Sequence, residues 1–186
     1  VSGRSRTALY DITARMAERE VLWLPEALFD AFHLELQRLS RSGILLCEAG
    51  RVGFRHQTFY EYIRARSFLE APGRLTDTVL ARQHSLRVRP LLWHSLAYMR
   101  AVDPPTYAQE IERLWHADLR PHLKMLLIEF LGQLSNPGIS ETTLVAEKWG
   151  ETWYRSRILA TVPGSPGWFD WLADDHLVEI MRLPIE

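Results

Sequence analysis

The sequence predicts a mainly α-helical protein in which one small β-hairpin interrupts the helices of the N-terminal region. Three observations predict this class. Apolar residues recur three or four positions apart along most of the 186 residues, which is the spacing of one helix face. Residues 44–56 instead form two short apolar runs on either side of a glycine-containing turn. Beyond residue 72 the periodicity is helical throughout, which indicates an array of packed helix pairs.

Two helical stretches precede the hairpin. The apolar face of the first carries Leu9, Ile12 and Met16. We expect that helix to end near Glu18, and the apolar run 21–24 fits a short strand that Pro25 stops. The apolar stripe of the second helix consists of Phe29, Phe32, Leu36 and Leu39. Gly43 stands where a glycine commonly ends a helix, because glycine adopts positive φ without a steric penalty.

The predicted hairpin joins a strand at residues 44–47 to a partner strand at residues 52–56. Between them, residues 48–51 form the turn, in which Gly50 is free to take a positive φ. A further helix begins directly after the second strand. The order of helix, helix, hairpin and helix matches a winged-helix domain.

His56 lies at the junction between the second strand and the following helix. Its position in the alternation puts it on the same strand face as Val52 and Phe54. Thr58 and Glu61 fit the S/T-x-x-E capping box, in which each side chain accepts a bond from an unpaired backbone N–H. We therefore expect an imidazole at a strand-to-helix corner, beside a helix N-terminus.

This stretch resembles the end of the winged-helix domain in NACHT-type STAND NTPases, which are bacterial signalling and antiviral defence ATPases related to animal NOD-like receptors. The pattern F-x-H-x-[ST]-[FV]-x-E-[YF]-x-x-A is matched by Phe54, His56, Thr58, Phe59, Glu61, Tyr62 and Ala65. In that family the histidine reaches the β-phosphate of ADP on the neighbouring ATPase core and holds the molecule closed. The resemblance implies this role for His56. The family often has Ala-Ala where this chain has Arg64 and Ala65.

Residue type alone leaves a second interpretation of His56 open. A histidine on an apolar strand face is commonly a core group whose hydrogen bonds are satisfied, and the capping box would explain Glu61 completely. A phosphate contact is also chemically sound, because an imidazole can donate a hydrogen bond to a phosphate oxygen. The sequence has no G-x-x-x-x-G-K-[ST] loop, so ADP or ATP is expected only in a full-length protein that includes the ATPase core.

The second predicted domain is helical. The triplet Ala71-Pro72-Gly73 breaks the pattern, so we predict a winged-helix domain at 1–72 and a helical repeat domain at 73–186. Two helix pairs resemble each other, with starts at Val88-Arg89-Pro90 and Leu119-Arg120-Pro121. A repeat of about thirty residues is typical of helical solenoids. HEAT repeats fit best, and TPR-like stacking remains open.

A degenerate third repeat is expected from residue 151 to residue 183, and it contains a dense set of aromatic side chains. This set consists of Trp153, Trp168, Phe169 and Trp171. Aromatic residues dominate core burial, so core packing is a better explanation of the set than a binding patch.

Composition and motifs exclude several classes of function. The net charge of −1 provides no field that would attract nucleic acid or an anionic membrane. No apolar run reaches the roughly 20 residues of a membrane helix, and the single Cys47 excludes an internal disulfide, which fits a cytoplasmic protein. No catalytic motif or metal-ligand spacing is present. Because the chain begins with Val1 rather than Met, we expect a piece of a longer protein.

Three functions are compatible with these patterns. The first is a non-catalytic regulatory segment of a STAND ATPase, whose partners are the upstream ATPase core and protein ligands or oligomer partners of the repeats. The second is a winged-helix DNA-binding regulator with a helical dimerisation or ligand domain. Acidic residues among the basic ones of the second helix argue against it. The third is a plain protein-interaction scaffold.

Overall fold

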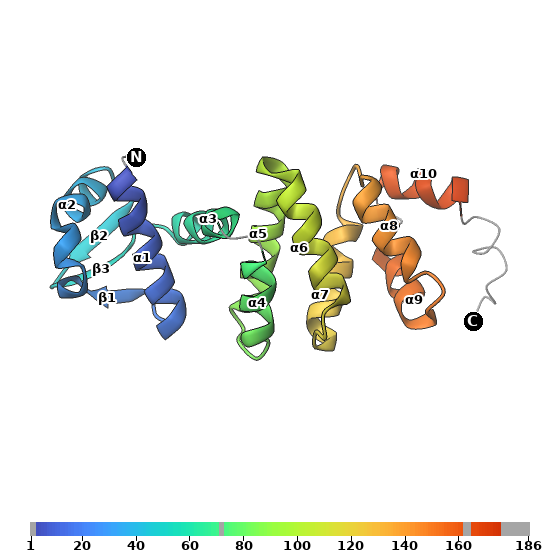
Figure 1. Cartoon of the computed structure of the whole chain (residues 1–186), viewed down its shortest axis with the longest axis horizontal. Helices are drawn as coiled ribbons and strands as arrows, with labels where there is room; N and C mark the ends of the chain where they lie inside the picture. Colours follow the sequence, from blue (N-terminus) through green and yellow to red (C-terminus); the bar gives the residue numbers. More distant parts are fainter. Residues whose placement is uncertain (1–2, 71–72, 162–164, 176–186) are drawn as a thin grey trace. The chain divides into compact units, whose positions relative to one another are not determined.

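The computed structural model describes residues 3–70, 73–161 and 165–175, and these residues are mainly helical with one small sheet (Figure 1). The α-helices are α1 (Gly3–Arg19), α2 (His33–Arg41), α3 (Gln57–Ser67), α4 (Arg74–Ala81), α5 (Val88–Val102), α6 (Pro104–His116), α7 (Pro121–Gly132), α8 (Ile139–Glu147), α9 (Thr152–Thr161) and α10 (Pro166–Asp175). The strands are β1 (Trp23–Pro25), β2 (Leu45–Glu48) and β3 (Arg51–Phe54), and two 3₁₀ segments are η1 (Glu26–Phe32) and η2 (Phe68–Glu70). The mainly helical class with a small sheet is therefore confirmed.

The chain divides into two compact units by its internal contacts. Unit 1 contains residues 1–75 and 90–107, and unit 2 contains residues 76–89 and 108–186. Residues 90–107, which hold most of α5, thus belong with the N-terminal elements. The boundary expected after residue 72, the winged-helix class and the solenoid class stay predictions.

The sheet of unit 1 is antiparallel, with strand order β1-β3-β2. The hairpin turn between β2 and β3 has positive φ at both central residues, 49° at Ala49 and 72° at Gly50, which is the arrangement whose twist matches paired strands. On the other edge of β3, Gly53 pairs with Trp23, and a Cβ on Gly53 would lie 2.9 Å from the Trp23 ring. Only glycine therefore fits the centre of this sheet.

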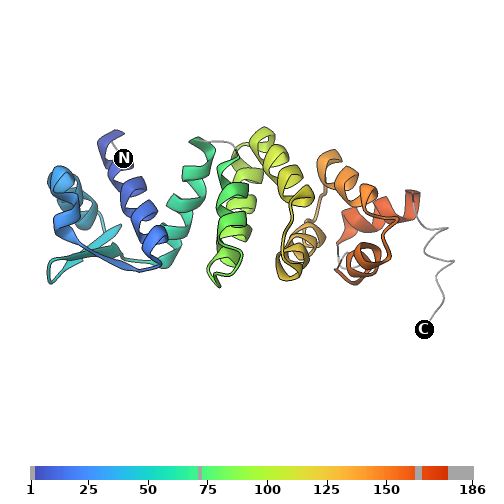
Figure 2. The same cartoon turned by 60° about the horizontal axis from the view of Figure 1, so that its bottom comes forward.

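Helices cover the sheet and enclose the core of unit 1. Helix α1 contacts α2, η1, β1 and α3, and Figure 2 shows α1 and α3 as neighbouring helices. The core consists of Leu9, Ile12, Met16, Leu24, Phe29, Leu36, Leu39, Leu45 and Val52. This set includes the apolar faces that the sequence predicts for the first two helical stretches. Burial of one such side chain contributes roughly 1.5–3 kcal/mol to folding.

The second helical stretch differs in its first half from the single helix that its spacing predicts. Residues 26–32 form η1, with a non-helical φ of −125° at Phe29, and α2 begins only at His33. Its C-terminal end is as predicted. Gly43 has φ 75°, and the Ile44 N–H donates to the Leu39 carbonyl at 3.0 Å, as in the Schellman motif that ends many helices.

Unit 2 is organised around the apolar helix α7, which contacts α9. Trp168 is fully buried, and its Nε1–H donates to the Leu131 carbonyl at 2.7 Å. The Ser165 hydroxyl donates to the Leu134 carbonyl at 2.6 Å, so two carbonyls at the end of α7 have side-chain donors. Core packing is thus the correct interpretation for Trp168, whereas Phe169 is 59% exposed.

The described helices were compared with the length and apolarity of a membrane-spanning helix. Within residues 3–70, 73–161 and 165–175, no helix combines the length and apolarity needed to cross a bilayer.

Candidate functional site

His56 occupies an exposed position at the start of α3. It is the N-cap residue of that helix, with extended backbone angles of φ −131° and ψ 139°. The side chain is exposed, and its ring lies 5.7 Å from the ring of Phe59, at an interplanar angle of 57°. An accessible imidazole beside a helix N-terminus can approach a phosphate, because both the ring N–H and the helix dipole favour an anion there. The core interpretation of His56 is wrong.

The capping box expected at Thr58 and Glu61 is wrong. Strand β3 ends at Phe54 and α3 begins at Gln57, so Thr58 lies inside the first helical turn. No side chain caps the helix start; instead the Phe59 N–H donates to the His56 carbonyl at 3.0 Å. The N-cap residue is therefore His56, with its extended backbone, and not Thr58, which the S/T-x-x-E spacing predicts.

Glu61 instead connects α3 to α5. It accepts a hydrogen bond from Gln57 Nε2 at 2.7 Å and lies 3.1 Å from Nδ1 of His94. The carboxylate is 20% exposed and the imidazole is 46% exposed. Solvent screens such a pair, so it orients the two helices more than it stabilises them. His94 was not singled out from the sequence, because nothing in the local pattern relates it to α3.

The departure from the family pattern at Arg64 has a structural explanation. Arg64 is buried to 8% relative exposure, and its guanidinium carbon lies 4.8 Å from the centre of the Phe68 ring. A cation over an aromatic face is an attractive contact that a planar guanidinium makes well. The neighbouring Ala65 is 1% exposed. A large residue at position 64 is therefore accommodated without displacing the small one.

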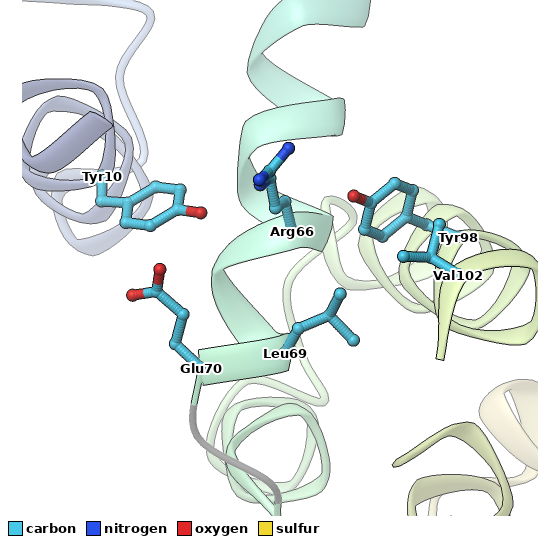
Figure 3. Close-up of a pocket in the computed structure, with 6 residues that line it drawn as sticks. All are labelled: Tyr10, Arg66, Leu69, Glu70, Tyr98 and Val102. Atoms are coloured by element: carbon cyan, nitrogen blue, oxygen red, sulfur yellow. The ribbon is translucent and has the colours of Figure 1, made fainter. Parts of the chain in front are cut away.

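A second candidate site is a pocket of about 230 Å³ in unit 1 that the sequence analysis missed. It is lined by Tyr10, Arg66, Leu69, Glu70, Tyr98 and Val102 (Figure 3). These residues come from α1, α3, η2 and α5, which are far apart in the chain. In Figure 3 the hydroxyl groups of Tyr10 and Tyr98 point toward the guanidinium of Arg66 from opposite sides. No sequence motif could have joined these residues, because only the packing of three helices places them around one space.

The polar groups of this pocket perturb one another. The Arg66 guanidinium donates to the Tyr62 hydroxyl at 3.2 Å. Burial raises the pKa of Tyr10, and the negative charge of Glu70 raises it further. Burial also raises the pKa of Tyr98, whose hydrogen bond to Tyr62 adds to the shift. That same hydrogen bond, together with Arg66, lowers the pKa of Tyr62. At neutral pH, Tyr10 and Tyr98 are therefore protonated phenols that can donate hydrogen bonds.

One hydroxyl in the pocket stands out. The oxygen of Tyr10 is shielded from solvent, and its O–H has no acceptor among the described residues, although the neighbouring Arg66 guanidinium acts as a hydrogen-bond donor that lowers the pKa of Tyr10. Leaving a buried polar group unpaired costs roughly 1–3 kcal/mol. A group of this kind at the wall of a pocket indicates a place where a ligand could supply the missing partner.

Other chemistry is sparse in the described part of the chain. Residues 3–70, 73–161 and 165–175 hold no group of three or more His, Cys, Asp or Glu side chains placed to bind a metal ion. Burial raises the pKa of the Cys47 thiol, which disfavours the reactive thiolate form. The His56 corner and the Arg66 pocket are thus the two places where the described side chains suggest binding.

Comparisons with protein-family models, with curated proteins and with solved structures found no match to this chain.

Proposed function

We propose that this chain is a non-catalytic regulatory segment of a NACHT-type STAND ATPase. In this proposal residues 1–72 form the winged-helix domain, and His56 contacts the β-phosphate of ADP held by an adjacent ATPase core. Residues 73–186 form HEAT-like repeats that sense a protein ligand or partner. The nucleotide is a component of the full-length protein, because this chain has no phosphate-binding loop of its own.

The observation that carries the proposal is the exposure of His56 at the N-cap of α3. A latch on a nucleotide held by another domain requires a side chain that points away from its own core. The seven-position pattern from Phe54 to Ala65 supports the same assignment. The ring of Phe59, another residue of the pattern, lies 5.7 Å from the imidazole.

The latch would act by shifting a population. ADP that bridges the core and His56 contributes binding free energy to the closed state only, so losing the contact favours the open, oligomerising state. A hydrogen bond to a charged group contributes about 1.5–3 kcal/mol, which corresponds to a shift of about 10- to 160-fold in the ratio of the two states.

The test is His56→Leu in the full-length protein, with His122→Leu as the matched control. His122 is also exposed and lies in α7, which belongs to unit 2. We expect His56→Leu to lose bound ADP faster and to raise basal oligomerisation, whereas His122→Leu behaves as the wild type. ADP retention by chromatography and oligomer size by light scattering measure both quantities. Equal ADP retention in the two variants would contradict the latch.

A further inference from the structure

The pocket around Arg66 combines groups that match the two ends of one small molecule. We propose that it binds a free amino acid with an apolar side chain, whose carboxylate contacts Arg66 and whose ammonium contacts Glu70. This inference goes beyond the proposed function and does not depend on it. The volume of about 230 Å³ suits a small ligand, because sites for drug-sized ligands usually measure roughly 300–1,000 Å³.

The upper part of the pocket is suited to a carboxylate. Arg66 offers a planar fork of N–H donors, of which the Tyr62 oxygen accepts one at 3.2 Å. The Tyr10 hydroxyl points toward the same guanidinium (Figure 3), and its own O–H has no acceptor among the described residues. A carboxylate oxygen placed between them would accept from both groups. It would thereby remove the cost of the unpaired phenol.

Glu70 lies one helical turn beyond Arg66 and supplies the opposite charge. In Figure 3 the Glu70 carboxylate lies on the same side of the pocket as Tyr10, below Arg66, so one zwitterion can approach both charges. The present partner of Glu70 is Arg6, at 3.9 Å between Nε and Oε1, and both side chains are more than half exposed. Such a pair is weak. A ligand ammonium can therefore compete for the Glu70 carboxylate.

The remaining wall is apolar and accounts for the side-chain preference. Leu69 and Val102 lie together on the side of the pocket that carries Tyr98, opposite Tyr10 and Glu70 (Figure 3). Apolar surface removed from water contributes about 25 cal/mol per Å². Amino acids with aliphatic or aromatic side chains should therefore bind more tightly than glycine or serine.

The first experiment measures ligand binding to residues 1–186 by calorimetry. Leucine is compared with two analogues, 4-methylpentanoate, which lacks the ammonium group, and 3-methylbutylamine, which lacks the carboxylate. We expect leucine to bind with millimolar or tighter affinity and each analogue to bind at least about 10-fold more weakly. Binding of 4-methylpentanoate as tight as that of leucine would overturn the assignment. So would the absence of amino-acid binding up to about 10 mM.

The second experiment uses variants with matched controls. Glu70→Gln should weaken leucine about 10-fold and leave 4-methylpentanoate unchanged, because only the contact to the ammonium is lost. Glu18→Gln, at an exposed glutamate elsewhere on unit 1, should change neither affinity. Tyr10→Phe should weaken both ligands. Glu70 is exposed, so its variant is expected to fold, and an unchanged leucine affinity in Glu70→Gln would contradict the proposal.

Discussion

Helices contact one another by different chemistry in the two units. In unit 1, α3 meets α5 through polar groups, with Glu61 beside His94 and the ring of Tyr62 5.3 Å from that of Tyr98. In unit 2, the buried residues of α7 itself are all apolar, and Trp168 is 0% exposed. Polar, partly exposed contacts are weak and can rearrange, whereas a dry apolar contact stabilises one arrangement. The comparison indicates that unit 1 is the part whose helix contacts a ligand could alter.

The largest effect is expected for Trp168→Ala in unit 2. Removing a fully buried indole leaves a cavity and takes away the side-chain donor of the Leu131 carbonyl, which keeps the Leu134 N–H at 3.1 Å, so we expect a loss of about 3–5 kcal/mol in the free energy of unfolding. Urea denaturation followed by circular dichroism measures it. Phe169→Ala, at a 59% exposed neighbour, should cost less than about 1 kcal/mol. Equal losses would show that α10 does not pack through Trp168.

A smaller loss in the free energy of unfolding is expected for Glu110→Ala, which removes a buried polar group of unit 2. Glu110 is 0% exposed and accepts from the Thr76 N–H at 3.1 Å and from the Thr76 hydroxyl at 2.6 Å. Glu110→Ala leaves these donors unpaired, so we expect a loss of about 1–3 kcal/mol. Glu112→Ala on the exposed side of α6 is the matched control and should change little. An unchanged free energy of unfolding in Glu110→Ala would mean that this buried contact of unit 2 is as weak as the polar contact of unit 1.

The polar contact in unit 1 should matter least for stability. We expect His94→Gln to lower the free energy of unfolding by less than about 1 kcal/mol, because solvent screens the 3.1 Å pair with Glu61. Thermal denaturation measures this change. Hydrogen exchange should nevertheless show faster opening of α5 in the variant. A loss in the free energy of unfolding as large as that of Trp168→Ala would mean that the Glu61–His94 contact is not weaker than the packing of Trp168.

Alkaline pH should lower the stability of unit 1, because it ionises buried tyrosines there. Tyr10 and Tyr98 have pKa values raised above 10.0 by burial. The unfolded chain releases these protons first, so stability is complete below pH 10 and falls as pH rises through the folded-state pKa values. Tyr10→Phe should reduce this loss, as measured by urea midpoints between about pH 8 and 11. A steeper loss in the variant would contradict the shift. The lowered pKa of Tyr62 acts in the opposite direction.

Local sequence patterns predicted most of the elements, and the failures have specific causes. The glycine turn at Gly50 and the helix end at Gly43 were correct because positive φ is a property of single residues. The capping-box prediction was wrong although Thr58 and Glu61 have the right spacing. The helix begins two residues earlier than this spacing implies, because His56 is the N-cap residue. The kink at Phe29 was missed for a similar reason, since its apolar spacing continues through η1 and into α2.

The sequence by itself determined the helical class, the hairpin, the buried faces of the helices and the place of His56 at the start of α3. These features depend on residues within a few positions of one another. Only the tertiary structure decided that Glu61 meets His94 and that Tyr10, Arg66 and Tyr98 surround one pocket. Such contacts join residues that are dozens of positions apart, and their formation depends on how whole helices pack, which no local pattern encodes.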